Sequence, residues 1–189
     1  MQSRGLKPTG GRLVRHNLQD LSLFFRGLVD PVDFSTEGDT YISFLVYWTR
    51  NHSNEAARLR LQLGEDGRTF IGFQANGTDL NSMRLTSRLA GQDDHAGETA
   101  YLANTVYLVV VKVTPVARGT DTLSASVFGP DDQVGDEPAT WDVTSTAGTS
   151  EVFRAIGWNA QLYAGEGLDR EFSIDEVRVG SSWISVTSP

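Results

Sequence analysis

The chain of 189 residues contains no cysteine. This absence excludes a disulfide framework, thiolate catalysis and zinc–thiolate sites. No run of 18 apolar residues occurs, so no transmembrane helix or membrane insertion is expected. Residues 1–11 also lack the apolar core of a signal peptide. These absences leave a folded domain without covalent cross-links as the expectation.

Positive charge is scarce as well. The chain has 16 Lys and Arg against 24 Asp and Glu, which gives a formal net charge of −8. An acidic chain repels phosphate backbones and anionic lipid headgroups, so nucleic acid is not an expected partner. Hydrophobic residues make up 39% and charged residues 21%, a composition typical of a folded protein. The length fits one domain that spans residues 1–189 and buries a sizeable core.

Alternation of apolar and polar residues dominates the chain and is the period of β-strands. Residues 41–50 carry apolar groups at both parities, which predicts a central strand covered on both faces. In residues 57–63, three leucines alternate with Arg58, Arg60 and Gln62. The segment after the next Gly-containing turn alternates too, and the two predict a hairpin.

Other segments complete an all-β pattern. Further strands are expected at residues 11–14, 83–89, 105–116, 121–128 and 152–161, with a closing strand from residue 171. Residues 18–28 form either a strand or an irregular apolar segment. Polar loops are expected at residues 90–99 and 129–138. About ten short strands with little helix predict a two-sheet antiparallel β-sandwich of the jelly-roll kind.

Two segments resemble a known family. One is the closing stretch EFSIDEVRVGSSWISVTSP of residues 171–189, and the other is YLVVVKVT of residues 107–114 followed by DTLSASVFGP of residues 121–130. Together they resemble laminin-G-like domains of the concanavalin A-like lectin/glucanase fold, over roughly residues 41–189. The resemblance implies a carbohydrate-binding or adhesion module of a secreted or surface bacterial protein, with an extracellular location. It also implies that Trp183 plugs one end of the sandwich.

The sequence departs from this family at its N-terminus. Only about forty residues precede Tyr41, and they carry little strand pattern. The first strand of the family is therefore expected to be absent. A missing strand would leave an open sheet edge, which invites a homodimer or a strand donated by a neighbour.

Catalytic motifs are weak. The resemblance implies that glucanases of this fold carry a Glu-x-Asp-x-x-Glu or Glu-x-Asp-x-Glu pattern on one strand, and this chain has neither. Asp175 and Glu176 are adjacent and would point to opposite faces. The alginate-lyase branch needs a cleft lined by Arg, Gln, His and Tyr, but the three histidines lie in polar, loop-like segments. We therefore expect a protein that is not an enzyme. A purely structural module and a hydrolase or lyase with dispersed residues remain the alternatives.

Four aromatic residues are candidates for sugar binding, because sugars stack their C–H faces on exposed rings. Trp48 and Trp158 share strand faces with apolar neighbours, which favours core packing over stacking. For Trp141, which follows the acidic loop, both interpretations are open. Tyr163 lies in a Gly-rich segment and is the freest to stack.

Calcium is the one metal that the sequence suggests. It takes six to eight oxygen ligands from carboxylates and carbonyls. Asp131 and Asp132 lie in the acidic loop, and Asp175 lies on the closing strand, where related sugar-binding domains hold a structural calcium. Solvated carboxylates are the competing and favoured interpretation of these residues.

Overall fold

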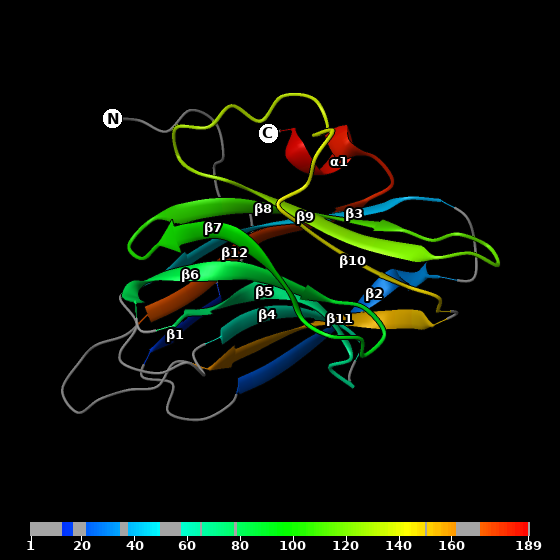
Figure 1. Cartoon of the computed structure of the whole chain (residues 1–189), viewed down its shortest axis with the longest axis horizontal. Helices are drawn as coiled ribbons and strands as arrows, with labels where there is room; N and C mark the ends of the chain where they lie inside the picture. Colours follow the sequence, from blue (N-terminus) through cyan, green and yellow to red (C-terminus); the bar gives the residue numbers. More distant parts are fainter. Residues whose placement is uncertain are drawn as a thin grey trace.

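The computed structural model describes residues 13–16, 22–34, 38–49, 58–64, 66–77, 79–149, 151–161 and 171–188. These ranges form two six-stranded antiparallel sheets that pack face to face (Figure 1). The first, sheet I, has the order β1 (Leu13–His16), β12 (Glu171–Gly180), β3 (Thr40–Trp48), β8 (Val106–Thr114), β9 (Asp121–Phe128) and β10 (Val143–Ala147). The second, sheet II, has the order β2 (Ser22–Asp33), β11 (Val152–Gln161), β4 (Arg58–Leu63), β5 (Thr69–Asn76), β6 (Asp79–Arg88) and β7 (His95–Leu102). The predicted jelly-roll β-sandwich is confirmed.

The core lies between the two sheets and follows strand parity. The inward-facing valines of β8 and the three leucines of β4 belong to one buried cluster, together with Phe44, Trp48 and Phe73. The Trp48 ring lies 4.9 Å from Phe73 of the opposite sheet and 5.5 Å from Tyr107 of the neighbouring strand. No helix in the described ranges is long and apolar enough to cross a membrane.

The N-terminal region supplies strands, which corrects the expectation that the first strand is absent. Residues 13–16 form β1, which pairs antiparallel with β12 in the register Leu13 to Ile174. Residues 22–33 form β2, which pairs antiparallel with β11. Pro31 does not end β2, because it lies between Gly27 and Val32, where the pairing of this edge strand with β11 is irregular. β1 therefore occupies the edge beside β12 that was expected to be open, and the predicted homodimer or donated strand has no support from a missing strand.

Two further edge strands are absent from the sequence prediction. β7 falls partly in the expected polar loop at residues 90–99, and β10 follows the acidic loop. β7 buries only two of its eight residues, Gly97 and Tyr101. A strand at the edge of a sheet covers little core, so its composition stays polar and its period is hard to detect.

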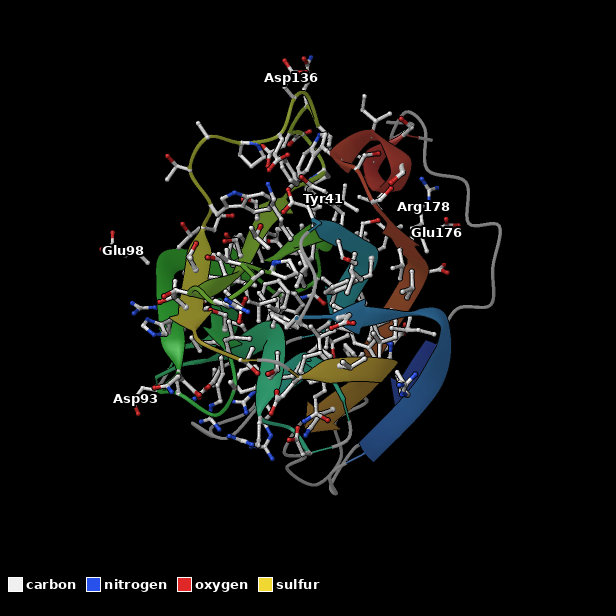
Figure 2. All side chains as sticks on the ribbon, turned by 90° about the vertical axis from the view of Figure 1, so that its right-hand side faces the viewer. Tyr41, Asp93, Glu98, Asp136, Glu176 and Arg178 are labelled. Atoms are coloured by element: carbon white, nitrogen blue, oxygen red, sulfur yellow. The ribbon has the colours of Figure 1, made fainter. Side chains whose placement is uncertain are left out.

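The closing strand contains a β-bulge. The register with β3 shifts between Asp175 and Arg178, and Glu176 has a φ of 53°, in the left-handed region. Beyond the bulge, the apolar side chains Val177 and Val179 are 40% and 44% exposed. Figure 2 shows Glu176 and Arg178 close together on this strand, and their side chains form an ion pair of 3.3 Å.

A short helix, α1 (Trp183–Thr187), follows β12 and covers the outer face of sheet I together with the β9–β10 loop (Figure 1). Ser182 caps it, and Ser185 completes a capping box. A second hydrophobic cluster joins α1 to sheet I. Trp183 and Val186 of the helix form it with Tyr41, Leu108 and Val110 of the sheet. The Trp183 Nε1 donates to the Gly135 carbonyl at 2.8 Å. Trp183 therefore seals an outer sheet face and does not plug an end of the sandwich.

Replacement of Trp183 by alanine is expected to lower the free energy of unfolding by about 3–5 kcal/mol, because it removes the centre of this second cluster. Ile184 lies on the same helix and is 71% exposed, so Ile184→Ala is the matched control and should change stability by less than about 0.5 kcal/mol. Denaturant unfolding of both variants measures the difference. Equal effects would contradict the assignment of Trp183 as the anchor of α1.

Candidate functional site

Three of the four predicted sugar-binding aromatics, Trp48, Trp141 and Trp158, lie in the described part of the chain, and all three pack in hydrophobic clusters. Trp48 and Trp158 are 1% and 8% exposed and lie in the core, so neither ring face is open to a ligand. This corrects their candidate role in stacking. Trp141 is half-buried and packs edge-to-face on Trp183 at 5.9 Å, as part of the cover of sheet I. Tyr163 lies outside the described residues.

The predicted calcium ligands are not gathered either. Asp131 and Asp132 are exposed in the β9–β10 loop, where Asp132 accepts a hydrogen bond from the Gly129 backbone N–H at 2.6 Å. Asp175 accepts from the Glu176 N–H at 2.9 Å. In the part of the chain that the structure describes, no three His, Asp or Glu side chains come together in a way that could hold a metal ion. Calcium binding stays a prediction from the sequence.

The outer face of sheet II carries a different set of side chains. The inner positions of β4, β5, β6 and β11 belong to the core, so the alternate positions point outward. We call these outward residues the arginine face: Arg58, Arg60, Gln62, Phe70, Gln74, Arg84, Thr86, Arg88 and Asn159. Cross-strand pairing makes them one continuous surface, because Arg58 pairs with Gln74 and Gln74 pairs with Arg84. An acidic protein thus concentrates four arginines on a single sheet face.

Two of the arginines lie over one aromatic ring. The Arg60 guanidinium carbon is 3.9 Å from the centroid of Phe70, and that of Arg88 is 5.3 Å away. Phe70 itself is fully buried although it is not part of the core cluster. Cation–π contact and burial hold these guanidinium groups in place. Burial lowers the pKa of Arg60 to about 10, against the opposing effect of the nearby Asp94 carboxylate.

Several polar atoms of this face are buried without a hydrogen-bond partner. They are the Nε atoms of Arg58 and Arg60, the Oε1 of Gln62 and the Oδ1 of Asn159. The Gln62 and Asn159 residues are only 5% and 6% exposed. An unsatisfied buried polar atom costs about 1–3 kcal/mol. Neighbouring side chains cover these atoms, so a ligand would meet the exposed groups of the face, such as Arg84, before it meets them.

A hollow of about 250 Å³ opens at one side of the arginine face. It is lined by Gln74, Asn76, Arg84, Thr86, Asp94 and Ala96. Asp94 comes from the loop between β6 and β7 and brings a carboxylate to the rim. The hollow thus presents a cation, an anion and two amides to one ligand.

The basic residues of sheet I whose side chains the structure describes, Lys112 and Arg178, both form ion pairs. Lys112 Nζ lies 2.9 Å from Asp39 and 2.7 Å from Glu137, and Tyr41 donates its hydroxyl to Glu137 at 2.7 Å. Burial, with the bond to Glu137, raises the pKa of Tyr41. In Figure 2, Asp136 projects from the loop above this group. Among the residues that the structure describes, the covered outer face of sheet I therefore gathers no comparable set of unpaired cations.

Comparison with known proteins identifies the fold. No protein-family model and no curated protein matches this chain. Among solved structures, an endo-β-1,4-glucuronan lyase from Trichoderma reesei is 12% identical and has a TM-score of 0.53, over 98% of this chain and 94% of that one. A PL-14 alginate lyase from Aplysia kurodai is 10% identical with a TM-score of 0.50, over 78% and 71% of the two chains. The shared feature is the jelly-roll β-sandwich.

These structures overturn the prediction that the chain is not an enzyme. That prediction depended on the absence of the Glu-x-Asp-x-x-Glu or Glu-x-Asp-x-Glu motif of glucanases. Both similar structures are lyases, so the absence of a glucanase motif is no argument against catalysis on this fold.

The strand pattern of β4 contains a signal for the arginine face. Residues 58–62 alternate Arg, Leu, Arg, Leu and Gln. In a chain of net charge −8, a strand whose outward positions are all basic or amide-bearing is a functional signal in its own right. Arg84, Arg88 and Asn159 could not be joined to it, because only strand pairing brings them together.

Gly72 forms the floor of this face between Arg60 and Thr86. A Cβ at this position would overlap the Leu59 carbonyl oxygen and the Arg60 Cα, which are backbone atoms and cannot move aside. Gly72→Ala should therefore lower the free energy of unfolding by about 3 kcal/mol. Gly135→Ala is the control, since nothing lies within 4 Å of its added Cβ. Thermal unfolding of both variants tests the prediction, and a fully stable Gly72→Ala protein would contradict it.

Proposed function

We propose that this chain recognises an acidic glycan whose uronate carboxylates bind to the arginine face of sheet II. The observation that carries the proposal is the gathering of four arginines and three amide side chains on one sheet face of an acidic protein. Guanidinium groups bind carboxylates with charge-assisted hydrogen bonds, and amides bind hydroxyls. The similarity in fold to a glucuronan lyase and an alginate lyase supports the same class of ligand.

A phosphate polymer is a poorer fit than a polyuronate. The net charge of −8 repels a long, dense polyanion, and only the arginine face would attract it. A polyuronate has a lower charge density than nucleic acid and carries hydroxyl groups beside each carboxylate. An extracellular or surface location, where such polymers occur, stays a prediction.

Cleavage of the bound glycan by β-elimination is a second candidate function. When arginine and amide groups bind the uronate carboxylate, they stabilise the negative charge that develops as a base removes the C5 proton. The C4–O bond then breaks, the leaving oxygen takes up a proton, and a C4=C5 double bond remains. Among the described strands of sheet II, His and Tyr occur only as His95 and Tyr101, and Tyr101 lies in the core. The described strands therefore supply the carboxylate-binding groups, and we assign no base.

Loss of Arg84 should weaken glycan binding. Arg84 is exposed at the hollow, and Arg84→Ala is expected to raise the Kd for polyglucuronate about tenfold, the value of one charge-assisted hydrogen bond. Arg118→Ala, in the exposed turn after β8 of sheet I, removes the same charge and should leave the Kd within about twofold. Calorimetry with polyglucuronate, alginate and a neutral β-glucan measures the effect. Binding of the neutral glucan alone, or of none of the three, would sink the proposal.

The elimination reaction has its own test. Incubation with polyglucuronate or alginate should raise the ultraviolet absorbance as C4=C5 double bonds form, and Arg84→Ala should reduce the rate. Binding without any rise in absorbance would contradict the second candidate function and leave the first intact.

A further inference from the structure

One carboxylate is placed among the arginines of the proposed site. Asp94 Oδ1 lies 2.5 Å from both the Nε and the Nη2 of Arg88, and its Oδ2 lies 3.4 Å from the Nη2 of Arg60. Arg60 also donates to the Gln74 Oε1 at 3.0 Å. The Asp94 side chain is 30% exposed and lines the hollow beside Arg84. It thus faces both the arginines and the space that a ligand would enter.

Asp94 divides the four arginines into two pairs. Arg60 and Arg88 share its negative charge. Arg58 and Arg84 form no ion pair with any residue in the described ranges, and they lie on either side of Gln74 in one cross-strand row. Two strand spacings separate them, which is about 10 Å at the backbone. The site therefore offers two spaced cations with a hydrogen-bonding amide between them.

We propose that Asp94 is a specificity-determining residue of the arginine face, which selects glycans that bring hydroxyl groups together with spaced carboxylates. This inference rests on the proposed function. The Asp94 carboxylate accepts hydrogen bonds from sugar hydroxyls in the hollow and repels any further carboxylate that approaches Arg60 and Arg88. Arg58 and Arg84 bind the glycan carboxylates.

Asp94 competes with the carboxylates of a ligand for Arg60 and Arg88. Without Asp94, four adjacent guanidinium groups would attract every flexible polyanion with little discrimination. With Asp94 present, a polyanion that lacks hydroxyls brings a second negative charge close to this carboxylate and offers it no hydroxyl donor. Its binding is therefore weakened by electrostatic repulsion and by desolvation of the Asp94 carboxylate. A sugar in the same place satisfies that carboxylate. Discrimination therefore comes from the repulsive element as well as from the attractive one.

The test compares Asp94→Ala and Asp94→Asn with Asp93→Ala. Asp93 is the adjacent residue, it is exposed and projects from the margin of the molecule in Figure 2, and its loss changes the net charge equally. The probes are polyglucuronate, which carries hydroxyls, and poly-L-glutamate, which carries carboxylates without hydroxyls. Binding is measured by calorimetry over a series of salt concentrations, at temperatures where circular dichroism shows each variant to be folded.

We expect the unmodified protein to prefer polyglucuronate. Both Asp94 variants should bind poly-L-glutamate about threefold to thirtyfold more tightly than the unmodified protein, because each freed guanidinium can form an ion pair worth up to about fivefold in affinity. The dependence of this binding on salt should also become steeper. Asp93→Ala should leave both affinities within about twofold.

The outcomes separate the two proposals. If the unmodified protein binds neither polymer, the proposed function fails. If it prefers polyglucuronate but the Asp94 variants behave like Asp93→Ala, only the role of Asp94 is overturned. The same holds if folded Asp94 variants lose affinity for both polymers, because Asp94 would then position the arginines rather than select the ligand.

Discussion

The packing of the two sheets against each other, centred on Trp48, is the constraint on which the rest of the structure depends. Trp48 belongs to sheet I and contacts Phe73 of sheet II at 4.9 Å. Once the leucines of β4 and the Ile71 and Phe73 side chains of β5 pack in this core, strand parity forces the alternate residues outward. The arginine face is therefore a direct consequence of core packing. A shift of one residue in any of these strands would bury the arginines and abolish both the core and the face.

The two outer faces of the sandwich differ in polarity and in what covers them. The outer face of sheet I is apolar and is closed by α1 and the β9–β10 loop, with Trp183 as the anchor. The outer face of sheet II is polar, carries the arginines and includes a hollow. Arg60 and Arg88 stack on Phe70 there and form ion pairs with Asp94, which leaves Arg58 and Arg84 as the cations without an ion pair in the described residues. A cation that is held rigidly in a low-dielectric surface attracts an anion more strongly than a solvated one does.

Much of the strand pattern could be predicted from local alternation. The expected bounds of β3, β4, β9 and β11 lie within two residues of the observed ones. Each of these strands buries one or both faces, so its sequence shows either an alternating pattern or a continuous apolar run. β7 was not, since an edge strand has few core contacts to enforce a period. The bulge at Glu176 was not expected either, because a left-handed backbone at a glutamate leaves no mark on the apolar pattern. Nor was α1, which depends on an apolar surface of sheet I that had not yet been built.

The sequence by itself determined the all-β architecture, the central position of β3 and the outward parity of Arg58, Arg60 and Gln62. These follow from periods of two residues, which are local. Only the tertiary structure decided that these side chains lie beside Arg84, Arg88 and Asn159, and that Asp94 contacts two of the arginines. It also decided that Trp48 and Trp158 are core residues. The physical reason is that strand pairing joins residues far apart in the chain, and no local pattern specifies which strands become neighbours.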